Sequence, residues 1–362
     1  MKKTLIATAT GLLLLQPVAY ANVDVSGYAS VIGGRVLSGT GVESEGIPPS
    51  FLANYPLVGV YEKDWSFKPD TRFGLQFRAN LTDGLSATAQ VVARGADDFD
   101  ARFEWAYLSY DLNDHWTLQA GKKRLPLYYY SDFFDVGYAY LWIRPPADNY
   151  TWQIFNYTGV NAMFNYFVGD WDISGNIYTG REDDSQNKLL SEYFPPRQPT
   201  REIWKNIVGG VLNLNRDWLD IRLTYMTYIN ERYRTIDGVV ERVTWGDSLT
   251  RRGKFAGVSV NMDFGSWIFL SELNRLDLDG GKFDTYMVSA GYRINQFTPY
   301  ISYADFDSAN EKHNTTSLGL RWDFHSNAAF KFQYDDVKDK SEPFWEVAGD
   351  SKSITFGVDL VF

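Results

Sequence analysis

Cysteine is absent from this chain of 362 residues. Its absence excludes disulfide bonds and thiolate metal sites, so neither can stabilise the fold. Histidine is scarce as well, with three residues, which leaves few candidates for a catalytic base or a histidine metal site. Beyond the N-terminus there is no apolar run of the roughly 20 residues that a membrane-spanning helix needs.

Positive charge is in the minority. Asp and Glu number 45 against 35 Lys and Arg, and the formal net charge is −10. This balance argues against a nucleic-acid partner, because proteins that bind nucleic acids present basic surface to the phosphates. Aromatic residues are plentiful by contrast, at 17% of the chain, with 24 Tyr, 24 Phe and 12 Trp.

The first 21 residues have the layout of a secretory signal peptide. Two lysines precede an apolar run from Leu5 to Leu15, and the motif AYA ends the segment at Ala21. Basic, apolar and small-residue regions in this order direct export and are then cleaved off. The sequence therefore predicts a cleaved signal over residues 1–21 and a single exported domain over residues 22–362.

The rest of the chain is organised in segments of about ten residues along which apolar and polar residues alternate. In FGLQFRANL, Phe73, Leu75 and Phe77 share one face, and Gln76 and Arg78 share the other. Such segments recur along the chain, separated in turn by tight turns and longer loops. In lipid every backbone group must be paired, which a closed barrel achieves. The pattern predicts an all-β, transmembrane antiparallel β-barrel of about 16 strands, with 18 strands as the open alternative.

The final segment ends on an aromatic residue. In SITFGVDLVF the apolar residues Phe356, Val358, Leu360 and Phe362 lie on one face. Chain ends usually fray unless they are tied down. An apolar terminus is explained if the last strand pairs with the first, because this pairing removes both sheet edges and places the apolar face against lipid.

In these features the chain resembles the general diffusion porins of Gram-negative outer membranes. The likeness covers the signal, the strand count, a long third loop after AGKKRLPL and the terminal Phe362. It implies that the third loop, about residues 126–158, folds into the lumen and narrows the pore. It also implies that Phe356, Val358, Leu360 and Phe362 form a signal to the barrel-assembly machinery.

The resemblance further implies a constriction in which basic wall residues face acidic residues of the third loop. Arg78 and Arg94 lie on the polar faces of their strands, so both are expected to point inward. The alternation breaks at KKR, and the sequence leaves open which of these three residues faces the pore. Enterobacterial porins carry Pro-Glu-Phe-Gly-Gly in this loop, whereas this chain has YYYSD and WIRPP. The remaining candidates are Lys122, Lys123, Arg124, Asp132, Asp135, Arg144 and Asp148.

Small residues gather on the expected outward face of the strand over residues 85–94, at Ala87, Ala89 and Ala93. Small side chains allow close protein contact within a membrane, whereas later strands carry large apolar residues that suit lipid. We expect this region to form an oligomer seam, and the resemblance implies a homotrimer. The other expected partners are outer-membrane lipid, lipopolysaccharide, the barrel-assembly machinery and small solutes.

The function favoured by the sequence is passive diffusion of small hydrophilic solutes and ions through a water-filled channel, with no cofactor or metal. The alternative is a substrate-selective channel, in which loop tyrosines stack sugars or basic wall residues favour phosphate and other anions. An enzyme is not expected, because His115, His313 and His325 fall in turns or a surface loop and none lies mid-strand.

Overall fold

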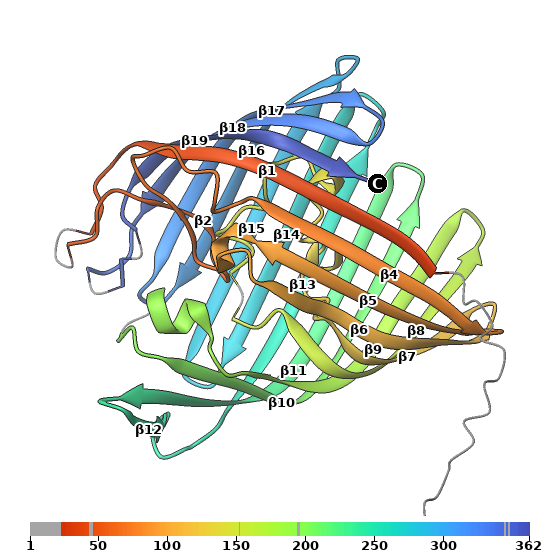
Figure 1. Ribbon diagram of the computed structural model, residues 1–362, viewed down its shortest axis with the longest axis horizontal. Helices are drawn as coiled ribbons and strands as arrows, with labels where there is room; N and C mark the ends of the chain where they lie inside the picture. Colours follow the sequence, from red (N-terminus) through yellow and green to blue (C-terminus); the bar gives the residue numbers. More distant parts are fainter. Residues whose placement is uncertain (1–22, 43–45, 152, 194–195, 344, 347) are drawn as a thin grey trace, which may run out of the picture.

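The computed structural model describes residues 23–42, 46–151, 153–193, 196–343, 345–346 and 348–362, so the predicted signal peptide lies outside the described residues. Within this part, one antiparallel sheet closes into a barrel of sixteen strands, and the short β12 (Val239–Arg242) extends one hairpin (Figure 1). The predicted all-β barrel and its strand number are confirmed. The barrel strands are β1 (Val23–Gly39), β4 (Arg72–Thr82), β5 (Leu85–Arg94), β6 (Ala101–Asn113), β7 (Trp116–Arg124), β8 (Asn156–Val168), β9 (Trp171–Asp184), β10 (Thr200–Arg216), β11 (Leu219–Ile236), β13 (Arg251–Asp263), β14 (Trp267–Leu278), β15 (Gly281–Tyr292), β16 (Phe297–Ser308), β17 (Lys312–His325), β18 (Ala328–Asp339) and β19 (Ser351–Val361).

Closure of the barrel joins the two ends of the described chain. β1 pairs with β4 through residues 23–30 and with β19 through residues 28–39. Just beyond β19, the backbone of Phe362 exchanges two hydrogen bonds with that of Gly27, at 2.8 and 2.9 Å. The terminal aromatic residue is therefore part of the wall, which leaves neither of the two strands with a free edge along this seam.

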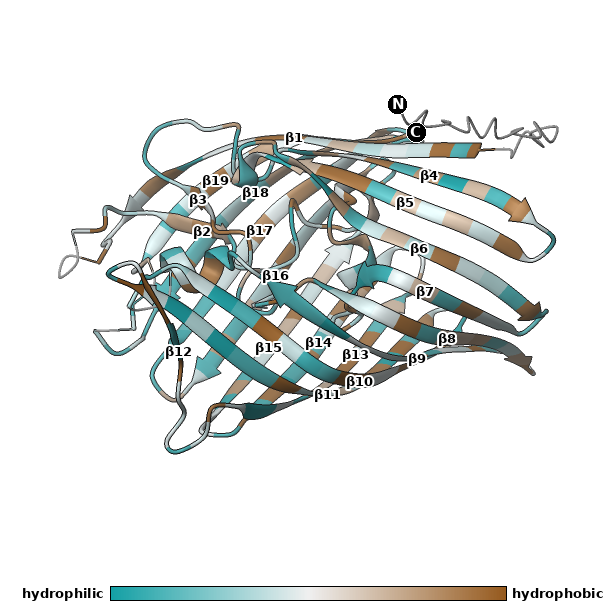
Figure 2. Cartoon of the chain, turned by 60° about the horizontal axis from the view of Figure 1, so that its bottom comes forward, coloured by the Kyte–Doolittle hydropathy of each residue, from teal (hydrophilic) through white to brown (hydrophobic). Residues whose placement is uncertain are grey.

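Alternation along each strand separates an outer face from an inner face. On β18, Lys331, Gln333 and Asp335 are buried, whereas Phe332 between them is exposed. Figure 2 shows hydrophobic and hydrophilic residues alternating along neighbouring strands. The outer face carries apolar side chains because it meets lipid, and the inner face carries polar ones.

The two ends of the barrel differ. One end has tight turns, such as residues 83–84 between β4 and β5. Aromatic pairs lie near this end, including Trp218 with Phe264 at 5.1 Å between ring centroids. Such rings suit the boundary between lipid and water. The opposite end carries the long connections, with β2 and β12 (Figure 1). No helix among the described residues is long and apolar enough to cross a membrane.

Three long connections shape the interior at this second end. Loop 1, residues 40–71, contains a hairpin of β2 (Phe51–Asn54) and β3 (Gly59–Tyr61). Loop 3, residues 125–155, contains two short 3₁₀ helices, η3 (Ser131–Phe133) and η4 (Gly137–Ala139). Loop 4, between β9 and β10, contains the π-helical turn η5 (Leu189–Tyr193). Many of their side chains are buried, so their polar groups need partners on the wall.

Candidate functional site: loop 3 and the inner wall

Loop 3 is attached to strands on widely separated parts of the wall. Arg222 of β11 donates a hydrogen bond to the carbonyl oxygen of Pro126 at 3.0 Å. Much farther round the barrel, the backbone N–H of Ile143 donates to Gln333 Oε1 of β18 at 3.0 Å. The wall side chains thus replace water as partners for the backbone of a buried loop.

Aromatic residues of loop 3 pack against apolar side chains of the inner wall. Tyr130 lies edge-on to Trp142 within the loop, with ring centroids 5.4 Å apart. Tyr128 contacts Phe255 of β13 in the same manner at 5.5 Å. This cluster gives the loop a hydrophobic core of its own, as a long buried loop requires. Its wall members include Trp204, Tyr228, Phe255, Leu276, Met287 and Tyr300.

Lys331 of β18 is fully buried and fixes the middle of loop 3. Its ammonium group donates to three loop carbonyl oxygens, those of Gly137, Tyr140 and Trp142, at 2.6–2.7 Å. It also pairs with Asp359 of β19 at 3.0 Å. A buried charge is stable only when it is paired and fully hydrogen-bonded, which this arrangement achieves. The loop approaches so closely that a Cβ at Gly137 would lie 2.0 Å from Asp359 Oδ1, so this position requires glycine.

A second attachment, the Asp135 cluster, is defined by Arg72, Arg94, Glu104, Arg124 and Asp135, all buried. Arg94 makes a bidentate pair with Asp135, with both N–O distances at 2.7 Å. Arg124 reaches the same carboxylate at 2.6 Å, and Arg94 also contacts Glu104 at 2.7 Å. Arg72 donates to the backbone carbonyl of Asp135 at 2.8 Å. Burial opposes the charged form of Asp135, but Arg94 and Arg124 outweigh it and lower the pKa of this carboxyl.

Arg94, Arg124 and Asp135 of this cluster are among the constriction candidates of the sequence analysis, whereas Glu104 is not. In the pattern FEWAYLSY, simple alternation places Glu104 with Ala106 on the outward face. In the structure Gln90 pairs with Trp105 and Val91 with Phe103, so Glu104 occupies a β-bulge and turns inward. No signal in a single sequence marks this bulge, because it depends on the register between two strands.

The Arg144 side chain links loop 3, loop 1 and the wall. Its guanidinium lies 2.7 Å from Asp70 of loop 1 and 3.0 Å from Asp335 of β18. It also lies over the ring of Phe51, at 4.8 Å from the centroid. His313, expected from the sequence in a surface loop, is instead buried in β17. Its Nδ1 contacts Asp148, the last acidic candidate of loop 3, at 2.5 Å. Arg144 and Asp148 therefore both serve as attachments of the loop in this structure.

Four other candidates lie outside these clusters. Arg78 is exposed on the inner face of β4. Lys123 donates to Asn161 at 3.4 Å and lies over the Tyr107 ring at 4.9 Å. Gly121, with φ at +142°, breaks the alternation just before the KKR sequence. Lys123 and Arg124 both reach inner-face partners, and Lys122 is half-buried.

The fourth candidate, Asp132, borders open space. It is half-buried and lines a cavity of about 360 Å³ together with Arg222 and Asn213. A larger cavity of about 550 Å³ lies between Tyr129 and Tyr138 of loop 3 and the tight-turn end, where Asp217 and Trp218 line it. Both cavities have mixed polar and apolar walls, so solute-sized, hydrated space exists on the tight-turn side of loop 3.

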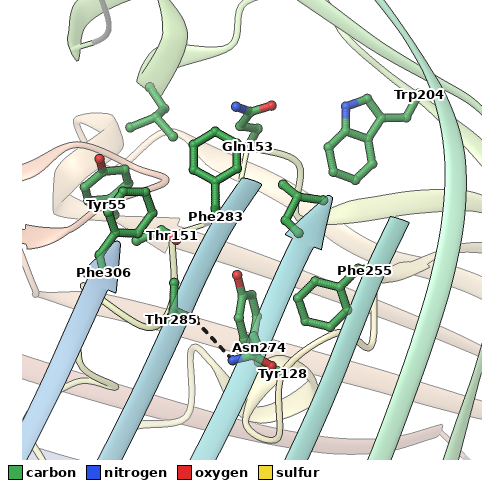
Figure 3. Close-up of a pocket in the computed structure, with 12 residues that line it drawn as sticks. Tyr55, Tyr128, Thr151, Gln153, Trp204, Phe255, Asn274, Phe283, Thr285 and Phe306 are labelled. Atoms are coloured by element: carbon green, nitrogen blue, oxygen red, sulfur yellow. Dashed lines mark hydrogen bonds between the residues drawn. The ribbon is translucent and has the colours of Figure 1, made fainter. Parts of the chain in front are cut away.

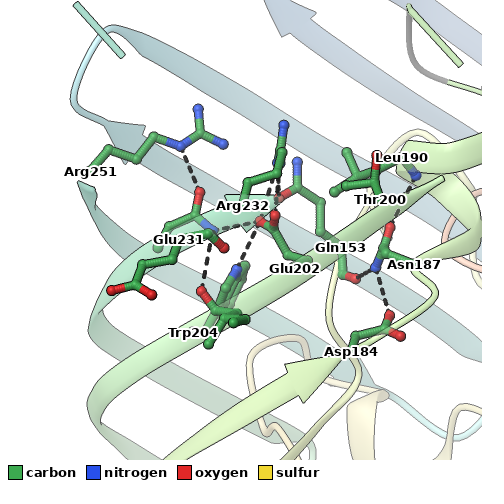
Figure 4. A network of polar contacts seen from close by, with 12 residues as sticks. Gln153, Asp184, Asn187, Leu190, Thr200, Glu202, Trp204, Glu231, Arg232 and Arg251 are labelled. Carbon is green, nitrogen blue, oxygen red and sulfur yellow. Dashed lines mark hydrogen bonds and ion pairs between the residues drawn. The ribbon is translucent and has the colours of Figure 1, made fainter. Parts of the chain in front are cut away.

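Loop 3 also meets a polar network at the long-loop ends of β10 and β11 (Figure 4). Arg232 pairs with Glu202 at 2.7 Å and contacts Gln153 of loop 3 at 3.4 Å. Asn230 donates to the same carboxylate at 2.8 Å and accepts from Arg251 at 2.8 Å. Within the part of the chain described, no three His, Asp or Glu side chains are grouped as ligands for a metal ion.

The residues predicted to act outside the pore lie on the outer surface. Ala87, Ala89 and Ala93 are half-exposed and alternate with the buried residues of β5. At the C-terminus, Phe356 and Val358 are half-exposed on the outer face of β19, and Leu360 and Phe362 are exposed. Each of these positions is therefore available for contact with lipid or with another protein.

A closed barrel of sixteen strands with a lipid-suited exterior and a loop bound to its inner wall defines a membrane channel of the outer-membrane type. The family model of Gram-negative porins matches residues 6–359, and the chain belongs to this family. A search of curated proteins finds no match.

Solved structures share the fold at low sequence identity. Salmonella typhi OmpF, in complex with daunomycin, has a TM-score of 0.60 at 12% identity and covers 94% of this chain and 98% of its own. The trimer form of Vibrio cholerae OmpT has a TM-score of 0.57 at 13% identity, over 94% and 99% of the two chains. The anion-selective porin from Comamonas acidovorans has a TM-score of 0.54 at 12% identity, over 94% and 100%.

Proposed function

We propose that this porin carries small hydrophilic solutes and ions across the outer membrane by passive diffusion, with loop 3 across the lumen as the element that limits their size. The observation that carries the proposal is the attachment of loop 3 at both Lys331 and Asp135. A loop held from two parts of the wall stays in one position across the lumen, as an element that limits solute size must. No enzymatic step, cofactor or metal is part of this function.

The loop-3 candidates divide into two roles. One group makes buried contacts that hold loop 3 in position; it comprises Arg94, Arg124, Asp135, Arg144 and Asp148. The inner-wall residues Arg78 and Lys123, with Asp132 of loop 3, supply the charges that a passing solute meets. Opposite charges on the two sides of a narrow aqueous path orient dipolar solutes.

A preference for anions is the second candidate, and one observation favours it. On β4 to β7 and loop 3, eight basic residues outnumber five acidic residues; the basic ones are Arg72, Arg78, Arg94, Arg102, Lys122, Lys123, Arg124 and Arg144, and the acidic ones are Glu104, Asp111, Asp132, Asp135 and Asp148. Selectivity for sugars would instead depend on exposed tyrosine rings, and we do not expect it. Most tyrosines of loop 3 are buried in its core and so offer no free face for stacking.

The test is conductance in planar bilayers with the purified protein and a salt gradient. Ohmic steps indifferent to added sugars and phosphate support general diffusion. A reversal potential whose sign shows anion selectivity supports the second candidate. The Arg78→Gln variant should then move that potential toward zero. Absence of conductance from correctly folded barrels would reject the channel function.

Assembly into a homotrimer through β5 and its neighbours is also part of the proposal. The half-exposed Ala87, Ala89 and Ala93 allow close approach of a second protein surface. The similar OmpT structure is described as a trimer form. Cleavage of residues 1–21, recognition of Phe356, Val358, Leu360 and Phe362 by the barrel-assembly machinery, and contact with lipopolysaccharide complete the proposed route to the outer membrane.

A further inference from the structure

The hairpin of loop 1, residues 51–61, is buried although it belongs to an exposed end of the barrel. Its β2 residues are all buried, and Tyr55 at the turn is 2% exposed. Leu52 and Tyr55 form an apolar cluster with Leu189 of loop 4, and Ala147 of loop 3 packs against it. This cluster is composed entirely of loop residues, so it is a hydrophobic core formed across the mouth and not part of the wall.

Tyr55 anchors the hairpin in an aromatic cradle (Figure 3). Its ring stacks on Phe306 of β16 at 6.2 Å and on His313 of β17 at 5.7 Å. Its hydroxyl donates a hydrogen bond to the buried carboxylate of Glu311, which lies between these two strands. Burial and the Glu311 charge hold the pKa of the Tyr55 phenol well above its ordinary value, so it remains a donor.

Further contacts of the loops reach other parts of the rim. Lys188 of loop 4 donates a hydrogen bond to the carbonyl oxygen of Ala96, in the connection between β5 and β6. Asn187 of loop 4 donates to the carbonyl oxygen of Gln153 of loop 3 at 2.5 Å. The hairpin itself approaches Ala96 at Gly59. Loop residues therefore connect rim positions near β5, β10 and β17.

The cavities beside Tyr55 are much smaller than those on the tight-turn side of loop 3. The two cavities lined by Tyr55 measure about 30 Å³ each, enough for one or two waters. On the tight-turn side the cavities measure about 550 and 360 Å³. The tight-turn end of a bacterial outer-membrane barrel faces the periplasm and the long loops face outward. The hairpin thus covers the outer entrance to a much wider inner vestibule.

We propose that the hairpin of residues 51–61 is an extracellular lid, recorded here in its closed position, and that solute entry requires Tyr55 to leave its cradle. This inference rests on the proposed function as a channel. The lid controls entry, whereas loop 3 limits size. Its release moves one hairpin and separates Phe51, Ala53 and Tyr61 from Val36 of β1. Because β2 and β3 pair only with each other, opening leaves the hydrogen bonds of the barrel sheet intact.

A reversible covalent lock provides the first test. A Cβ on Gly59 would lie 3.7 Å from the Cβ of Ala96, which is within the usual separation for a disulfide. Because the chain has no cysteine, the Gly59→Cys/Ala96→Cys pair would be its only disulfide. The oxidised protein is expected to show lower bilayer conductance than the same protein after reduction. Each single-cysteine variant serves as the control and should not respond to reduction.

The second test releases the lid and does not depend on disulfide geometry. Tyr55→Phe keeps the ring but removes the hydrogen bond to the Glu311 carboxylate, and the open fraction should rise about tenfold or more. Tyr178→Phe is the matched control, because the Tyr178 hydroxyl of β9 is buried and has no hydrogen-bond partner among the residues that the structure describes. The lid proposal would be refuted if the oxidised and reduced forms of the double-cysteine variant conducted equally and Tyr55→Phe behaved like the wild type. The channel function would remain supported in that case. A wild-type protein that never conducts would overturn the channel function itself.

Discussion

Replacement of Asp135 by asparagine is the sharpest perturbation of the loop-3 attachment. The change preserves size but removes the negative charge that lies between Arg94 and Arg124. The two buried guanidiniums would then share the single carboxylate of Glu104. Removing one partner from a buried ion pair typically costs about 3–5 kcal/mol. Since each 1.4 kcal/mol is a tenfold change in an equilibrium, the released state of loop 3 should become about 100- to 4,000-fold more populated.

Hydrogen exchange of the purified barrel, read by mass spectrometry, measures this change directly. Amide groups of loop 3, such as Val136 N–H bonded to Phe133 at 2.8 Å, should exchange faster in the Asp135→Asn variant. The Asp132→Asn variant is the matched control, because Asp132 belongs to the same loop but lies half-buried against open space. Its loop exchange should match that of the wild type.

Two outcomes would refute the reasoning. Unchanged exchange in loop 3 of Asp135→Asn would show that the ion pairs do not hold the loop. Equal acceleration in the barrel strands and in the loop would show that the cluster stabilises the whole barrel. In the expected case single-channel conductance also rises, because a released loop no longer narrows the pore.

The remaining predictions concern acid, assembly and association. Because the Asp135 pKa is lowered in the folded protein, the stabilisation it gives is complete above the ordinary Asp value of about 3.9 and is lost as pH falls through the lower folded value. The protection factor of loop 3, which corrects exchange rates for their intrinsic pH dependence, should therefore stay constant from pH 7 to about 5 and fall only in stronger acid. A fall near pH 5 would contradict the assigned direction of the shift. Deletion of Phe362 removes two backbone hydrogen bonds to Gly27. It should reduce the fraction of protein that runs as the folded band on a gel after heating, whereas Phe362→Tyr should not. Ala89→Trp on the half-exposed face of β5 should convert trimers to monomers in native mass spectrometry, and Leu318→Trp on the exposed face of β17 should not; trimers in both variants would exclude the β5 seam.

Much of the architecture follows from the sequence because a barrel wall is a local pattern. A period of two assigns the side chains of β18 and β19 to the two faces, and it holds wherever a strand is regular. The same rule accounts for Phe362, since an apolar alternation that runs to the last residue needs a paired strand. The same alternation places Arg94 on the inner face, and its strand is regular.

The tertiary structure alone decided which charges meet and which loops close the mouth. Glu104 turns inward through a register shift against β5, which alternation within β6 cannot reveal. Lys331 and Asp359 come together through the pairing of β18 with β19, and their loop partners through the path of loop 3. Tyr55 meets Glu311 across 256 residues of sequence. Which residues share a face of a strand follows from a local period of two. Contacts between residues far apart in the sequence depend instead on barrel closure and on the packing of loops, and every strand contributes to both.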